Sequence, residues 1–185
     1  TYYSFWNTQT GETEPIDGTK LTETQYPVIF GDGKYQLKVW TKDEAGNICE
    51  DTWQEEFKVD TTAPELENLY LTTADVDGAV GILAQDQNSL VYRYIYQNAV
   101  NIQISFNCDI SGQSKIEYQF TSSFAYDNAK WNEYNAKTGL TVNPNKKFIL
   151  AVHATDQAGN QTIVYSDGII VDNEAPVGEG LAPEI

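Results

Sequence analysis

The chain contains a single histidine, His153, and histidine is the side chain most often used as a general base near neutral pH. No serine or cysteine stands beside it in a nucleophile motif, and its position in an alternating stretch predicts a packed or half-exposed strand residue. The 27 Asp and Glu residues always include some pair at a spacing suited to glycoside hydrolysis, so acidity alone is no evidence for an enzyme. Gly78 and Gly81 open no helix and have no lysine partner for a phosphate loop. These residues predict a protein that is not an enzyme.

Aromatic side chains are the other groups whose chemistry suits a ligand, because their faces can stack on sugar rings. The stretch LVYRYIY at residues 90–96 alternates, which places its three tyrosines on one face of a strand. The candidates for ligand contact are Tyr92, Tyr94, Tyr96 and Trp131. The alternative is an added edge strand that uses Arg93 against edge-to-edge pairing, with the aromatic residues in the core or in cross-strand pairs.

The formal net charge of −16 limits the kinds of partner. Nucleic acids and anionic membranes are bound by Lys and Arg that displace counterions, so neither is expected as a partner of this surface. There is no apolar run long enough for membrane insertion and no signal peptide. The chain opens without Met in the middle of a strand pattern, so we expect an excised piece whose targeting segments lie elsewhere.

The elements that position these side chains are predicted to be β-strands. Thr, Val, Ile and Tyr are abundant, Met is absent, and apolar residues recur at a spacing of two between Asn, Asp and Gly turns. The fold class is therefore all-β, and 41% apolar residues are enough to form a core.

An internal repeat organises the chain. YQLKVWTKDEAGN at residues 35–47 matches FILAVHATDQAGN at residues 148–160 without gaps, an offset of 113. The sequence around Val59 recurs around Val171, and Tyr3 recurs as Tyr118. In each copy alternate residues face inward, and the chain then turns through Asp-X-Ala-Gly-Asn, where the glycine can take a positive φ. The period suits one β-sandwich of roughly 110 residues.

The Asp-X-Ala-Gly-Asn turn followed by Val-Asp-X-X-Ala-Pro resembles the last hairpin of bacterial immunoglobulin-like repeats, which occur in surface adhesins and large secreted proteins. The resemblance covers nearly the whole chain and implies tandem immunoglobulin-like Greek-key β-sandwiches. The chain is expected to consist of the C-terminal part of a repeat that lacks strands A and B (1–60), a linker (61–64), a complete repeat (65–172) with a long A–B insertion (72–97), and a linker with the start of a further repeat (173–185).

The strands of the complete repeat follow from the same alignment. They are A near 65–71, B near 99–107, C near 115–121, F near 147–155 and G near 161–172, with D and E within 127–143. The half-repeat 1–60 is expected to expose part of its core unless the missing strands are supplied.

The resemblance implies a non-catalytic, extracellular segment of a bacterial surface protein that acts as a stalk, spacer or adhesion module. Its partners would be neighbouring repeats in the same chain, with a host or polysaccharide molecule as a further candidate. The alternative is an accessory module, carbohydrate-binding or spacing, of a secreted enzyme that degrades polysaccharides. A cell-wall anchor in the complete protein would favour the first, and a catalytic domain the second.

The layout implied by the resemblance also predicts details. Tyr35 enters its strand as in a tyrosine corner, in which the phenol bonds to the backbone just upstream, whereas Phe148 at the matching position cannot. Cys49 and Cys108 lie about one domain length apart, roughly 35 Å for ten-residue strands, so both are expected to be free thiols.

Several hard oxygens are expected to converge where the two repeats meet. They belong to Asp32, Asp60, Asp109, Asp156 and Asn160. Crowded carboxylates repel each other, and Ca²⁺, which takes 6–8 oxygen ligands, is the cofactor that would relieve this repulsion. The alternative, which the frequency of aspartate in turns favours, is that these residues cap the turn and the linker by bonds to backbone amides.

Overall fold

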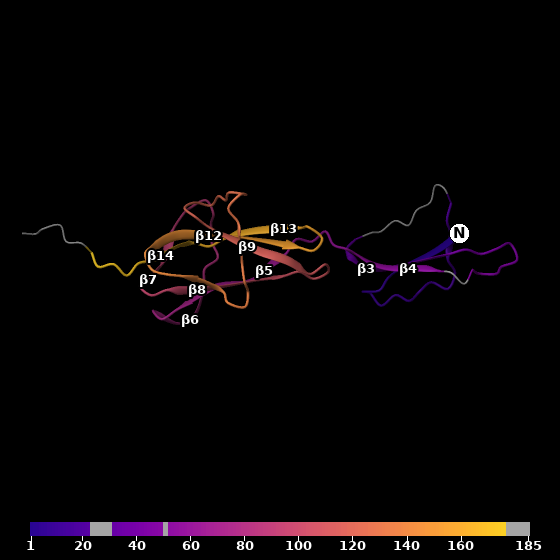
Figure 1. Ribbon diagram of the computed structural model, residues 1–185, viewed down its shortest axis with the longest axis horizontal. Helices are drawn as coiled ribbons and strands as arrows, with labels where there is room; N and C mark the ends of the chain where they lie inside the picture. The colour runs from indigo at the N-terminus through magenta and orange to yellow at the C-terminus, as the bar shows by residue number, and fades with distance from the viewer. Residues whose placement is uncertain (23–30, 50–51, 177–185) are drawn as a thin grey trace, which may run out of the picture.

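The computed structural model describes residues 1–22, 31–49 and 52–176, and within these ranges every regular element is a β-strand. The prediction of an all-β chain is therefore confirmed. Figure 1 shows two bodies end to end along the long axis of the molecule, the first in indigo and purple and the second in magenta to yellow. No helix in the described part of the chain is long and apolar enough to cross a membrane.

The first body is a four-stranded antiparallel sheet in the order β2-β1-β3-β4. Its strands are β1 (Tyr2–Asn7), β2 (Thr19–Lys20), β3 (Gly33–Trp40) and β4 (Trp53–Val59). Three aromatic rings hold its centre, because the ring of Phe5 stacks on Tyr35 at 5.0 Å and on Phe57 at 5.8 Å. The Tyr35 hydroxyl donates a hydrogen bond to the carbonyl of Gly31, 3.0 Å away. The predicted bond from this phenol to the backbone just upstream is therefore present.

The second body consists of two packed sheets. One runs β10-β9-β12-β14-β7, with β13 also paired to β12, and the other runs β11-β8-β5-β6. The strands are β5 (Glu65–Thr73), β6 (Val76–Gly81), β7 (Tyr92–Tyr96), β8 (Val100–Asn107), β9 (Gln113–Thr121), β10 (Asn132–Glu133), β11 (Leu140–Val142), β12 (Lys146–Asp156), β13 (Gln161–Tyr165) and β14 (Gly168–Val171).

The core of the second body lies between these two sheets. Leu71 and Ile102 from one sheet and Leu150 and Val152 from the other are fully buried in a single cluster. Alternate residues of β8 are buried along its whole length, which is the pattern of a strand with one face on a core. Two sheets packed in this way are consistent with a β-sandwich.

The strands predicted near 65–71, 99–107, 115–121 and 147–155 correspond to β5, β8, β9 and β12. The last predicted strand, 161–172, is divided into β13 and β14. The two strands are separated at Ser166 and Asp167. The Ser166 hydroxyl accepts a hydrogen bond from the Leu150 amide and donates one to the carbonyl of Asp167. Within the predicted insertion 72–97, β6 pairs with β5, and β7 pairs in parallel with β14.

The pairing registers of the two bodies agree with the sequence match. Tyr3 lies opposite Val39 in the first sheet, and Tyr118 lies opposite Val152 in the second body. Val39 and Val152 are matched residues at the offset of 113. The short outer strand also corresponds, because Tyr3 pairs with Thr19 and Tyr118 with Asn132.

Candidate functional site

The linker between the two bodies is bound from the side of the first sheet by Asp32. One carboxylate oxygen of Asp32 accepts hydrogen bonds from the Thr61 amide at 2.9 Å and from the Thr61 hydroxyl at 2.8 Å. The other oxygen accepts a bond from the Thr62 hydroxyl at 2.6 Å. Bonds from Thr62 and Thr61 stabilise the ionised form and lower the pKa of Asp32, against the small opposing effect of burial.

The second body binds the same linker from the other side. The Asn160 side-chain amide donates to the carbonyl of Asp60 at 3.0 Å, and the Ser111 backbone amide donates to the Asp60 carboxylate at 2.9 Å. The hydroxyl of Thr162 donates to the carbonyl of Pro64 at 2.6 Å. We call residues 60–64, together with the side chains and amides that bond to them, the linker joint.

Asn160 reaches the linker because its turn is fixed internally. The Asp156 carboxylate accepts bonds from the Asn160 backbone amide at 2.9 Å and from its side-chain amide at 2.8 Å. Gly159 takes a φ of +94°, which favours glycine. Burial of Asp156 raises its pKa, but the Asn160 bonds outweigh this effect and the net shift is downward.

The first body contains the same turn. Asp43 accepts bonds from the Asn47 backbone amide at 2.7 Å and from the Asn47 side chain at 2.8 Å, and Gly46 takes a φ of +95°. These bonds, that from the Asn47 side chain first, lower the pKa of Asp43. The Asp-X-Ala-Gly-Asn sequence therefore has one local structure in both copies, and only the second copy bonds to a described linker.

The five predicted calcium ligands are distributed around the joint. Asp60, Asp156 and Asn160 lie together, whereas Asp32 binds the opposite side of the linker and Asp109 accepts a bond from the Asn107 side chain at 2.6 Å. In residues 1–22, 31–49 and 52–176, no group of three or more His, Cys, Asp and Glu side chains is arranged to hold a metal ion. The carboxylates cap linker and turn amides, which is the capping alternative drawn from the sequence.

Sequence reasoning placed Thr61 and Thr62 in the linker but did not identify the bonds that they form, nor the bonds from Ser111 and Thr162 to the linker. Thr61, Thr62 and Ser111 contribute backbone amides, and a backbone amide leaves no trace in residue type. The threonine pair before Ala-Pro was visible in the sequence, but its partner is 29 residues away from Thr61 and cannot be read from local pattern.

Both cysteines are free thiols, and Cys49 is exposed. Cys108 lies beside the joint, where burial raises the pKa of its thiol and the charges of Asp156, Asp60 and Asp109 add to the effect. A raised pKa lowers the fraction of the Cys108 side chain that is present as thiolate.

The three tyrosines named as candidates for ligand contact lie on β7. The tyrosine face of this strand points inward: Tyr96 is 8% exposed, and the Tyr94 hydroxyl donates to the carbonyl of Gly81 at 2.7 Å. The ring of Tyr92 lies under the Lys147 ammonium at 4.2 Å. Outward positions are held by Ile95, which is 68% exposed, and by Arg93, which pairs with the buried Asp167 carboxylate at 2.8 Å. Alternation predicted the two faces, but it could not say which of them meets the core.

Trp131 and His153 belong to one packed cluster on the outer side of β12. Their ring centroids lie 5.2 Å apart, and the Trp131 ring also contacts Tyr126 at 5.4 Å. The Nδ1 atom of His153 lies 3.3 Å from the Glu117 carboxylate, which is itself paired with Lys115. His153 is therefore a packed strand residue.

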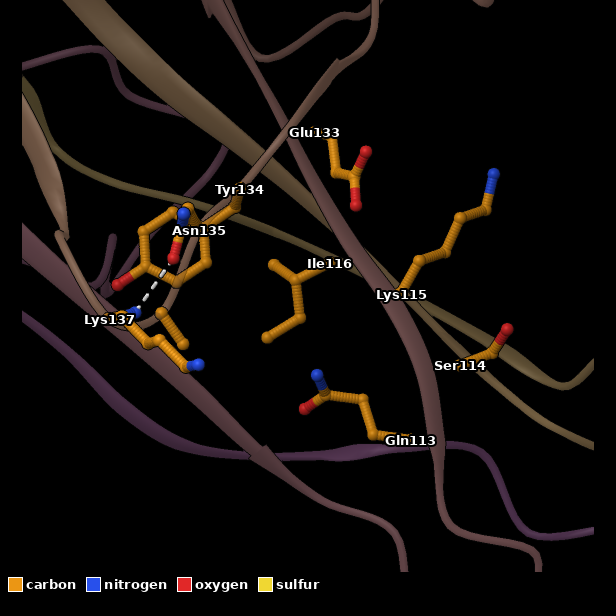
Figure 2. Close-up of a pocket in the computed structure, with 9 residues that line it drawn as sticks. Gln113, Ser114, Lys115, Ile116, Glu133, Tyr134, Asn135 and Lys137 are labelled. Carbon is orange, nitrogen blue, oxygen red and sulfur yellow. Dashed lines mark hydrogen bonds between the residues drawn. The ribbon is translucent and has the colours of Figure 1, made fainter.

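An open pocket of about 510 Å³ lies between the start of β9 and the segment after β10. Figure 2 shows the Ile116 side chain between Tyr134 and Gln113, with Lys115 and Lys137 on opposite sides. The Tyr134 hydroxyl is used structurally, because it accepts a bond from the Ile104 amide and donates one to Gln103. Burial raises its pKa. The pocket is lined by one carboxylate, Glu133, and by the ammonium groups of Lys115 and Lys137.

No protein-family model matches the sequence, and no curated protein matches it.

Proposed function

We propose that this chain is a non-catalytic segment of tandem immunoglobulin-like Greek-key sandwiches that acts as a stiff spacer or stalk in an extracellular bacterial surface protein. The observation that carries the proposal is the linker joint. Asp32 binds the linker from the first body, and Asn160, Ser111 and Thr162 bind it from the second.

A linker bonded on both sides opposes swivelling between the bodies. Each such hydrogen bond contributes about 0.5–1.5 kcal/mol net, and bonds to charged groups contribute more. Bending at the joint would break several of these bonds at once. The sum of their contributions therefore opposes the conformational entropy that a freely moving linker would gain. Proline at position 64 also fixes its own φ.

The repetition of the joint's parts supports an array. The bond from Thr61 to Asp32 has a counterpart after the second body, where the Asn173 amide donates to the Asn145 side chain at 3.4 Å. The bond from the Thr62 amide to Asp60 likewise has a counterpart in the bond from Glu174 to Asp172. Hydrogen bonds that recur at both linkers are expected if neighbouring repeats are joined at a constant angle.

The surface suits this role. A chain with a net charge of −16 repels other copies of itself and anionic surfaces, which favours an extended, soluble array. The accessory-module alternative gains no support from β7, whose tyrosines face the core.

Pulsed electron paramagnetic resonance tests the proposal. Spin labels would be attached at the native Cys49 and at a cysteine introduced as Ala79→Cys, with Cys108→Ser to prevent a third label. We expect one narrow distance distribution. Asn160→Ala with Thr162→Val should broaden it, whereas Asn47→Ala, which removes the matching side-chain bond to Asp43 away from the joint, should not. A broad distribution in the otherwise native chain would show that the linker does not hold the bodies.

A further inference from the structure

The first sheet has an apolar face that is only partly covered. Cross-strand partners lie on the same side of a sheet, so the pairing registers define this face. Its apolar members are Tyr3, Phe5, Tyr35, Leu37, Val39, Trp53, Phe57 and Val59. Glu55, which lies opposite Leu37, is a charged residue on the same face. Trp53 is 53% exposed, and Phe5, Leu37, Val39 and Phe57 are half-buried. We call this surface the open face.

The second body shows what covers the matching surface there. Phe148, Leu150 and Val152 occupy the places of Tyr35, Leu37 and Val39, and they are 3%, 0% and 0% exposed. They are buried against a sheet whose central strands are β5 and β8. In the part of the chain that the structure describes, the first body contains one sheet only.

The first sheet also differs from the second body at its outer edge, which is formed by β4. In the second body β14 is flanked by β12 on one side and by the parallel strand β7 on the other. β4 takes the place of β14, since Phe57 pairs with Tyr35 as Ile169 pairs with Phe148. β4 pairs with β3 alone among the described residues, and no other described strand pairs with its outer edge.

A charge on this edge indicates the chemistry of the missing strand. Counting from the matched Phe57 and Ile169, Glu55 stands where Asp167 stands in the second body. Asp167 is paired with Arg93 of β7 at 2.8 Å, whereas Glu55 is exposed. A strand that adds to β4 in parallel would bring a residue to the position of Arg93.

We propose that the first sheet is the docking surface for a β-segment of the same kind as residues 64–107. Two antiparallel strands of this segment cover the open face with alternate apolar side chains, and a third adds in parallel to β4 with a basic residue against Glu55. The inference rests on the proposed array of repeated sandwiches and specifies what completes its first member.

The test is a fusion in which a second copy of residues 64–115 is placed directly before Thr1 of the full chain. The join follows the register, since Tyr3 matches Tyr118. Amide hydrogen exchange should slow about tenfold or more in β4, because its outer edge becomes paired. Arg93→Glu in the added copy should reverse much of this protection, and combining it with Glu55→Arg should restore it.

Two outcomes would overturn the proposal. One is a folded added copy that leaves β4 exchange unchanged. The other is an unmodified chain that forms a dimer with β4 already protected, because the occupant would then be a second copy. If the fusion fails to fold, the binding of anilinonaphthalene sulfonate to the unmodified chain decides: we expect binding that Trp53→Lys reduces, and its absence contradicts an open face. The spin-label distances across the linker joint do not depend on this result, so failure here leaves the spacer proposal separately testable.

Discussion

The side-chain amide of Asn160 donates a hydrogen bond to the backbone carbonyl of Asp60, 100 residues earlier in the chain, at 3.0 Å. The same asparagine is held by Asp156 through two further bonds, so the turn that ends β12 is also the part of the second body that binds the linker. Asn47 occupies the matching place in the first body and has the same bonds to Asp43. Comparing the two asparagines therefore separates the stability that the turn bonds contribute from the stability that the bond to the linker contributes.

Replacing Asn160 by Ala should destabilise the second body more than Asn47→Ala destabilises the first. Both variants lose the side-chain bond to an aspartate and keep the backbone amide bond, but only Asn160→Ala also removes the donor to the Asp60 carbonyl. We expect an additional cost of about 1 kcal/mol. Urea unfolding followed by amide signals assigned to each body measures the two costs separately. Equal costs would mean that the bond to Asp60 contributes nothing.

Tyr35→Phe should destabilise the first sheet by about 1 kcal/mol, because the ring packing is kept while the bond to the Gly31 carbonyl is lost. Phe148→Tyr at the matching buried position should give no comparable gain, since a hydroxyl placed in a well-packed core costs free energy unless it finds a partner. Thermal unfolding of both variants checks this. A Tyr35→Phe variant as stable as the parent would show that the tyrosine corner is not a stabilising element.

The agreement between sequence and structure was greatest where one repeat explains the other. Alternation at residues 148–152 predicted the face of β12 that meets the main core. The Asp-X-Ala-Gly-Asn turns predicted the two hairpins, because the glycine of each takes a positive φ. Alternation alone could not predict which face of a strand lies against the core. The two faces of residues 92–96 alternate equally well, and only packing against β14 and Gly81 decides that the tyrosines point inward.

Acid should loosen the joint. The pKa values of Asp32 and Asp156 are lowered in the folded chain, so each favours folding while ionised. This stabilisation is complete above the unfolded value of 3.8 and is lost as pH falls through the lower folded values. The Asp32→Asn side chain does not titrate. The distance distribution of this variant should therefore broaden less between neutral and acid pH than that of the native chain. Spin-label distances measured through this range test it, and a width unchanged below pH 3 would contradict the role of the carboxylates.

Calcium should leave the joint unchanged. The carboxylates of Asp32, Asp60 and Asp156 already accept bonds from amides and hydroxyls, and Asp109 is bonded to Asn107. We expect no heat on titration with millimolar calcium and the same unfolding midpoint with and without chelator. A saturable heat, lost in Asp156→Asn, would instead establish the interdomain calcium site that the sequence predicted.

The central claim is that the linker holds the two bodies in one orientation, and backbone residual dipolar couplings test it most directly. Couplings from β1, β3 and β4 would be fitted separately from those of β5, β8, β9 and β12 in the same weakly aligned sample. The account predicts the same alignment magnitude and axes for both sets. A clearly smaller magnitude for the first sheet, in a chain that still shows its strand pairing, would mean that the bodies move independently and would contradict a stiff spacer.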